Sequence, residues 1–212
     1  MSASAVDAGL REAVGNHLRR HLGPIEGVVG EHEKTHVPID LFVVAPSARR
    51  PFRVVVTCGM SRLRMHPPEE FASCQRAELF LGLPSDWRLD GEALRDPRWF
   101  WPFGLLKRLA RHPHTGGGWL WERHIVGADG AVPHGPGTAM NGALIAPAIN
   151  MPPAFDALRS PELGEIRFLS VLPLHPAETQ LGRDDGVTAL YGAFADADVD
   201  VVVRPGRPSS VV

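Results

Sequence analysis

The sequence predicts a single α+β domain in which helices pack on a central mixed or antiparallel β-sheet. Three observations carry this prediction. An amphipathic helix pattern stands near the N-terminus, and short apolar segments with strand character follow it. Helix and strand patterns then alternate to residue 203 with no internal repeat and no obvious linker. Glycine (22) and proline (20) together make up 42 of 212 residues, so we expect short elements joined by many loops.

The first helix is expected over residues 5–22. Its apolar residues recur at helical spacing and therefore share one face, and Gly23-Pro24 ends the pattern. The residues of this face are Val6, Leu10, Ala13, Val14, Leu18 and Leu22.

Two strands, 37–44 and 52–57, follow the helix. The segment between them runs from Pro46 to Pro51 and has turn composition, so the pair predicts a β-hairpin. A third strand is expected over 77–83. Both alternating positions of these strands are apolar in places, which indicates a sheet that is covered on two faces.

The second half of the chain alternates between the two element types. The segment 127–142 is rich in glycine and proline and is expected to be irregular. The elements expected are a helix over 98–111, strands over 119–126, 143–149 and 166–172, a helix over 184–195 and a short strand over 199–203. We accordingly divide the chain into an N-terminal helical segment (1–25), the main domain (26–203) and a tail (204–212).

Composition excludes several classes of protein. Hydrophobic residues (44 %) and charged residues (22 %) lie near the globular average, which excludes a disordered chain and a coiled coil. A formal net charge of −2 offers no basic excess for nucleic acid or for a membrane surface. The N-terminus lacks a signal-peptide pattern, and no apolar run approaches the ~18 residues of a membrane helix. We expect a cytoplasmic protein whose two cysteines, Cys58 and Cys74, are free thiols.

One pentapeptide matches a zinc-hydrolase motif. His32-Glu33-Lys34-Thr35-His36 fits H-E-x-x-H, in which two histidines one helical turn apart bind Zn²⁺ and the glutamate activates water. Glycines before it, Pro38 after it and the strand pattern that follows all disfavour a helix. A zinc-dependent hydrolase is therefore kept only as the alternative function.

Other chemistry-bearing residues give weaker patterns. His112 and His114, with His124 or His134, would make a metal set on paper, but ten histidines make such pairs common by chance. The glycines at 116–118 lack the lysine and hydroxyl residue of a phosphate loop and indicate a turn. Cys58, flanked by apolar residues, indicates a buried thiol. We expect no catalytic residues, no metal and no cofactor.

The more specific pattern is a set of short motifs in a fixed order. A strand bearing Asp40 is followed by Thr57-Cys58-Gly59-Met60-Ser61, then Met65, then Ala77-Glu78-Leu79. Near the end stands Leu172-Pro173-Leu174-His175-Pro176-Ala177-Glu178. In this order the motifs, from about residue 30 to about 195, resemble the Suppressor of fused domain family. The residues that carry the resemblance are Asp40, Thr57, Gly59, Met60, Ser61, Met65, Glu78 and Glu178.

Each of these residues also has a structural interpretation. Gly59 would allow positive φ where a strand leaves the sheet, and Thr57 would hydrogen-bond the backbone of that turn. Met60 and Met65 would fill gaps in the core or form an adaptable binding surface. Glu178 would lie near a helix start, where a carboxylate is favoured.

The resemblance implies a mixed α/β fold and a protein-binding role. The animal member of the family sequesters Gli-type transcription factors by gripping a peptide between two lobes, and this chain resembles the first lobe only. Bacterial relatives include immunity proteins that neutralise a cognate toxin, and the arginine-rich, GC-rich-codon composition suits a bacterial source. We therefore expect a non-enzymatic binder of a protein partner, of immunity or adaptor type, with no nucleic acid or membrane as partner and with its oligomeric state open.

Overall fold

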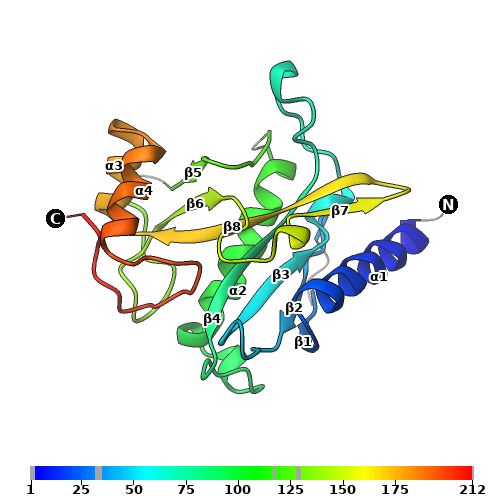
Figure 1. The fold of residues 1–212 in the computed structure, drawn as a ribbon, viewed down its shortest axis with the longest axis horizontal. Coiled ribbons are helices and arrows are strands. Elements are labelled where there is room, and N and C mark those ends of the chain that lie inside the picture. The colour runs from blue at the N-terminus through cyan, green and yellow to red at the C-terminus, as the bar shows by residue number, and fades with distance from the viewer. Residues whose placement is uncertain (1–2, 32–34, 117, 128–129, 212) are drawn as a thin grey trace.

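The computed structural model describes residues 3–31, 35–116, 118–127 and 130–211. Its centre is a mixed sheet in the order β1-β2-β3-β4-β8-β6-β5 (Figure 1). A further strand, β7, pairs with the first residues of β8. The strands are β1 (Ile25–Val29), β2 (Asp40–Val44), β3 (Phe52–Cys58), β4 (Ala77–Pro84), β5 (Ile125–Val126), β6 (Gly142–Ala146), β7 (Ala157–Ser160) and β8 (Gly164–Leu174). Neighbouring strands run antiparallel except β4 and β8, which run parallel. The mixed sheet confirms the predicted fold class.

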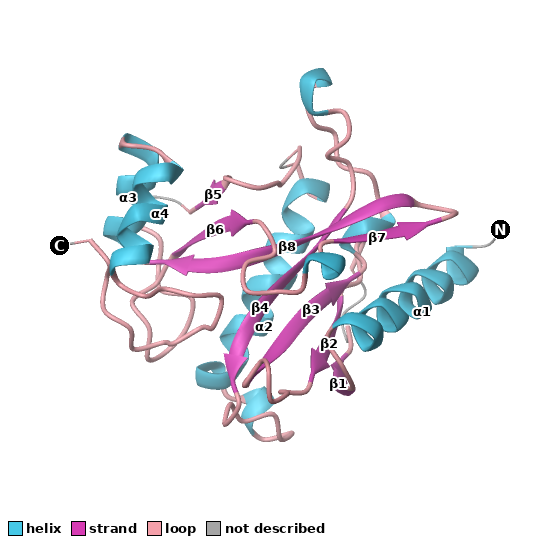
Figure 2. Ribbon diagram, viewed as in Figure 1, coloured by secondary structure: helices cyan, strands magenta, loops and turns pink. Residues whose placement is uncertain are grey.

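Helices cover both faces of the sheet (Figure 2). α2 (Pro97–Arg111) lies on one face, and α1 (Ala3–His21) and α4 (Val187–Asp196) lie on the other. α3 (Pro176–Asp184) precedes α4 and packs against it. The chain thus forms three layers around one sheet.

The alternation of side chains along β2 explains the two covered faces. Leu41 and Val43 point into the core beneath α2, whereas Phe42 and Val44 point into the core beneath α1. All four side chains are buried, so the strand has no solvent face and its sequence is apolar at both phases. This agrees with the expectation of a sheet covered on two sides.

The helix expected over 5–22 and the hairpin expected from 37–44 and 52–57 are both present. α1 begins two residues earlier than expected, and β2 pairs with β3 in antiparallel register from Asp40 opposite Cys58 to Val44 opposite Val54. Residues 77–83 form β4, and residues 98–111 lie within α2. Asp96 caps the start of α2 by accepting a hydrogen bond from the Arg98 amide.

Three expected elements differ in the structure. The helix expected over 184–195 is α4, which begins only at Val187 because Gly186, at φ +85°, interrupts the helical backbone; α3, which precedes it, was not expected. The strand expected over 119–126 is reduced to β5. The strand expected over 199–203 makes only one bridge, in which Val202 lies beside Gly82.

Two short strands were missed by the sequence pattern. β1 and β7 lie at margins of the sheet and are only partly buried, so they lack the apolar alternation that marks a strand. No described helix is long and apolar enough to cross a membrane.

Packing of α1 on the sheet generates the first prediction. Leu18 is fully buried against the core of β2, β3 and β8. Leu18→Ala should lower the free energy of unfolding by about 2–4 kcal/mol through lost apolar contact and a residual cavity, measured by chemical denaturation. Arg20→Ala, at an exposed position of the same helix, should change it by less than about 0.5 kcal/mol. Equal effects of the two substitutions would mean that α1 does not pack as described.

Candidate functional site

The T-x-G-M-S motif and Glu78 form one buried polar cluster. Thr57 is the next-to-last residue of β3, Gly59 precedes the short 3₁₀ helix at Met60–Arg62 that contains Ser61, and Glu78 lies on the neighbouring strand β4. The Glu78 side chain is fully buried. These residues, separated by about twenty positions in the sequence, therefore meet at one edge of the core.

Four hydrogen bonds converge on the Glu78 carboxylate. Its Oε1 accepts from the Gly59 amide (3.0 Å), the Ser61 amide (3.0 Å) and Ser61 Oγ (2.6 Å). Its Oε2 accepts from Thr57 Oγ1 (2.5 Å). Thr57 Oγ1 in turn accepts from the Leu79 amide (2.8 Å). A buried carboxylate with this many donors is satisfied inside the protein and fixes the turn that follows β3.

Gly59 makes this turn possible. Its backbone has φ +135°, and a Cβ at this position would stand 2.3 Å from the Pro38 carbonyl oxygen. Both observations exclude any other residue without local rearrangement. The positive φ expected from the sequence is thus present.

The two methionines of the motif lie in the core. Met60 is fully buried and Met65 is 2 % exposed, and both pack in the cluster beneath α2. The Leu120 amide approaches Met65 Sδ at 3.4 Å. Of the two roles that the sequence left open for them, the geometry supports gap filling and not an exposed binding surface.

Asp40 holds the N-terminal helix to the sheet. It begins β2, forms an ion pair with Arg11 of α1 and accepts a hydrogen bond from the Glu31 amide (3.0 Å). A small cavity of about 260 Å³ adjoins it, and Gly59 lines the same cavity. Asp40 and Gly59 are therefore the motif residues that border open space in this part of the described structure.

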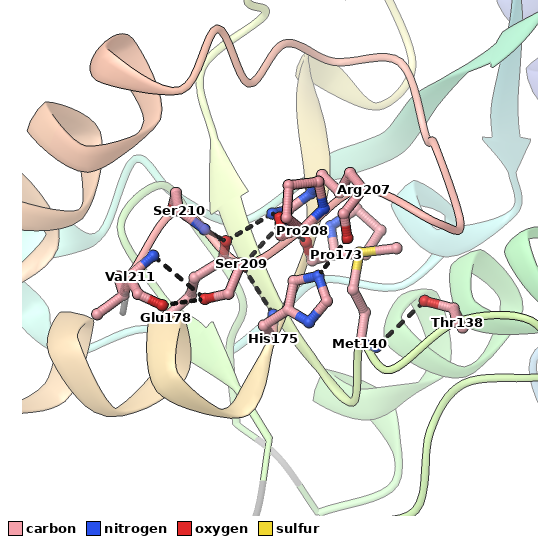
Figure 3. A network of polar contacts seen from close by, with 10 residues as sticks. All are labelled: Thr138, Met140, Pro173, His175, Glu178, Arg207, Pro208, Ser209, Ser210 and Val211. Carbon is pink, nitrogen blue, oxygen red and sulfur yellow. Dashed lines mark hydrogen bonds and ion pairs between the residues drawn. The ribbon is translucent and has the colours of Figure 1, made fainter.

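Glu178 forms a second buried carboxylate cluster, shown in Figure 3. Arg207 donates to both of its oxygens, from Nη1 to Oε1 (2.5 Å) and from Nη2 to Oε2 (2.6 Å). The Ser210 amide (2.8 Å) and Ser210 Oγ (2.9 Å) also donate to Oε1, and the His175 amide donates to Oε2 (2.7 Å). Glu178 lies in the first turn of α3, as its expected place near a helix start requires.

This cluster fastens the C-terminal segment to the sheet. Arg207 Nη2 donates to the Pro173 carbonyl at the end of β8 (2.9 Å), and His175 Nε2 donates to the Arg207 carbonyl (3.0 Å). The segment from Arg204, which we expected to be a tail, thus contacts β8 and α3 through residues that are far apart in the sequence.

The Glu178 carboxyl has a depressed pKa. Burial raises the pKa, but the hydrogen bonds from Arg207, Ser210 and His175 and the positive charge of Arg207 more than offset that effect. Folding therefore favours the ionised form of this group.

His36 does not lie on a helix, although the zinc-hydrolase hypothesis requires helical backbone there. His32 and Glu33 lie outside the described residues, and His36 lies exposed in a bend before β2. A pair of histidines one turn apart on a helix would need helical backbone at both positions. Among the residues the structure describes, no group of three histidine, cysteine or acidic side chains is placed to hold a metal ion.

The histidines of the second candidate set have separate surroundings. His114 Nε2 donates to the Met60 carbonyl (2.9 Å). His134 donates from Nε2 to the Gly142 carbonyl (2.8 Å), so its Nδ1 is the atom that accepts from Arg108 (3.3 Å). His124 Nδ1 accepts from the Trp121 amide (3.4 Å).

A groove that the sequence gave no sign of lies between α2 and the irregular segment before β6. Its volume is about 510 Å³. Leu105 and Leu109 of α2 and Ala143 of β6 form an apolar floor, and Arg108 lies at its edge. Val132, which is 81 % exposed, stands on the rim. The groove joins segments about 30 residues apart, and no local motif marks it.

The Gly59 turn generates a second prediction. Gly59→Ala should lower the free energy of unfolding by about 1–3 kcal/mol or more, because the methyl group meets the Pro38 carbonyl and the backbone conformation is strained. Gly192→Ala, in the exposed face of α4 with open space around its Cα, should raise it by about 0.5–1 kcal/mol. Denaturant unfolding of both variants measures this contrast, and a Gly59→Ala protein as stable as the parent would contradict the turn geometry.

The Glu178 cluster generates a third prediction. Because its pKa is lower in the folded than in the unfolded chain, the stability it contributes is present above the ordinary glutamate pKa of about 4.3 and is lost as pH falls through the folded value. Glu178→Gln should cost about 3–5 kcal/mol at pH 7, since Arg207 stays buried without a counter-charge, and should flatten the decline in stability below about pH 4.3. Denaturation at pH 7 and at acid pH measures both effects.

Glu162→Gln is the matched control, because it removes an exposed carboxylate from the loop between β7 and β8. Its effect should stay below about 0.5 kcal/mol at pH 7. If Glu178→Gln behaves like this control, the carboxylate cluster does not hold the C-terminal segment.

Comparison with known proteins agrees with these motifs. The family model for Suppressor of fused protein matches residues 35–208. The uncharacterized protein UU111 of Ureaplasma parvum serovar 3 is 22 % identical over 108 residues, and the match spans about half of each chain.

Solved structures share the fold at low identity. A Suppressor of fused homolog from Neisseria gonorrhoeae has a TM-score of 0.70 at 16 % identity, with 97 % of this chain and 98 % of that one covered. A chain in the Sufu–Fu complex has a TM-score of 0.64 at 15 % identity, with 95 % and 92 % covered. Drosophila Suppressor of Fused has a TM-score of 0.60 at 15 % identity, and this chain, 94 % of which is covered, spans about half of its length. The match of the family model over most of the chain places this protein in the Suppressor of fused family.

Proposed function

We propose that this chain is a non-enzymatic protein-binding domain that sequesters a protein partner, as an immunity-type or adaptor protein. The observation that carries the proposal is the state of its two motif carboxylates. Glu78 and Glu178 are fully buried, and internal donors engage the oxygens of both. A general acid or base must reach a substrate proton, and neither group is accessible to one.

Family membership supports the same proposal. The fold matches a chain of the Sufu–Fu complex, which is an assembly of two proteins. This chain spans about half of the length of the Drosophila protein. The contact surface proposed here is therefore sought on the described domain.

The groove between α2 and β6 is the contact surface we propose. Leu105 and Leu109 offer an apolar floor, and the exposed Val132 extends the apolar area to the rim. We take Val132 and the apolar floor as one apolar patch lining the groove, because a contiguous patch of this kind marks an interaction site. Arg108 at the edge makes no ion pair with a described residue and complements an acidic side chain. The occupant we propose is a partner segment with an apolar anchor next to an acidic residue.

Neutralisation of a cognate toxin in the producing cell is the immunity form of this proposal. It is supported by the single-domain size and by the mild net negative charge, which does not repel a basic toxin. The adaptor form differs only in the identity of the partner. One experiment separates them.

A native pull-down from the lysate of the source organism, followed by mass spectrometry, tests the proposal. The parent chain should retain one stoichiometric partner, and a toxin domain in that partner would support the immunity form. Val132→Asp should reduce retention at least about tenfold by placing a charge at the apolar rim. Val28→Asp, the same substitution at an exposed valine of β1 far along the sheet from β6, should leave it unchanged.

Loss of the partner with both variants would place the contact elsewhere or indicate misfolding, which circular dichroism distinguishes. If the parent chain retains no specific partner from cells shown to express candidate toxins, the binding proposal fails.

A further inference from the structure

A second cavity of about 570 Å³ adjoins the short 3₁₀ helix at His112–His114, whose first residue lines the groove and whose other two residues line this cavity. Two segments form it: residues 63–66, which follow the 3₁₀ helix at Met60–Arg62, and the residues from Pro113 onward, which follow α2. In Figure 1 the first of these continues into the loop that projects at the top of the view. Leu63 and Pro113 contribute apolar walls, and Arg64, His66 and His114 contribute the polar groups.

The polar groups of this cavity are all basic. No carboxylate is among its described lining residues. Arg64 and His66 have exposed side chains, and Arg64 forms no ion pair or side-chain hydrogen bond within the described ranges. Other arginines of this chain are commonly paired, as Arg76 is with the Ser61 and Arg62 carbonyls nearby. An arginine beside two histidines without a counter-charge fits an external anion.

His114 is held in an orientation that suits this role. Its Nε2 donates to the Met60 carbonyl (2.9 Å), so Nδ1 is a lone-pair acceptor in the neutral ring and becomes a donor when the ring is protonated. Burial lowers its pKa, the Met60 hydrogen bond raises it, and His66, His36 and Arg76 lower it further. A bound anion would act in the opposite direction and raise the pKa of His114.

We propose that this cavity binds a phosphate-type oxyanion, with Arg64, His66 and His114 as its side-chain ligands. The Arg64 guanidinium supplies a permanent positive charge and a fork of donors for phosphate oxygens, and the two imidazoles add ring nitrogens that donate when they are protonated. The side chains, and not the glycine-rich turn that follows them, carry the recognition. The inference is independent of the proposed partner groove.

Two sources of the phosphate group differ in what else they would contact. Phe71, which is 44 % exposed, stacks on Trp119 with ring centroids 5.0 Å apart. This pair lies next to the cavity, because the Gly118 carbonyl beside Trp119 accepts from the His66 amide (3.1 Å). The base of a nucleotide would reach an aromatic surface, and free phosphate would not.

The test is a titration of the full chain with inorganic phosphate, followed by the ring proton signals of its histidines in NMR spectra. Saturable shifts of His66 and His114, with a rise in the pKa of His114, are expected. Arg64→Ala should weaken binding about tenfold or more. Arg49→Ala, an exposed arginine in the β2–β3 turn, is the matched control and should not change it.

Adenosine monophosphate in place of phosphate identifies the source. A nucleotide is indicated if adenosine monophosphate binds more tightly than phosphate and if Phe71→Ala lowers its affinity to that of phosphate. Equal affinities for the two compounds indicate free phosphate. Shifts that do not saturate, or that are the same in the Arg64→Ala chain, would overturn the proposal. Retention of the protein partner would be unaffected in either case, so the two proposals fail separately.

Discussion

The burial of one carboxylate sets the geometry on which much of this domain depends. Glu78 lies inside the core of β4, where an ionised group is costly unless donors surround it. The donors come from the chain leaving β3, namely the amides of Gly59 and Ser61 and two hydroxyl groups. These hydrogen bonds therefore fix where the chain turns, and that turn directs Met60 and Met65 into the core beneath α2. A buried, fully hydrogen-bonded carboxyl group here defines a specific turn, which apolar packing alone would not define.

Glu178 repeats this arrangement at the other end of the sheet. There the donors are Arg207 and Ser210, which follow the last helix by about ten residues, and the His175 amide before α3. The two clusters differ in what they join. Glu78 connects the neighbouring strands β3 and β4. Glu178 instead connects the irregular segment from Arg204, which has little apolar content, to β8 and α3. In the second case Arg207 adds a counter-charge and two donors to the amides of His175 and Ser210.

Sequence reasoning reached the elements with strong local patterns. α1, the β2–β3 hairpin, β4 and α2 carry continuous apolar periodicity, and the family motifs marked Glu78, Gly59 and Glu178. It missed β1 and β7, which are short and lack an apolar alternation in sequence, and it missed α3, whose nine residues include few apolar side chains. The partner of Glu178 was also missed. A basic residue in a proline-rich, glycine-containing terminal segment gives no local sign that it will lie buried against a helix 29 residues earlier.

The residues that stabilise this fold differ from the residues that are available to bind a partner. Motif residues such as Thr57, Ser61 and Glu78 satisfy one another internally, so each constrains the others and little of their chemistry remains for a ligand. Val132 at the groove and Arg64 at the basic cavity are, in contrast, exposed side chains at the surface of the domain. Changes there alter recognition at small cost in stability, whereas a change at Gly59 or Glu178 disturbs the fold. Relatives can therefore share the fold at 15–16 % identity while the surfaces that determine partners vary. Partner identity in this domain must be sought on those surfaces and not in the motifs that identify the family.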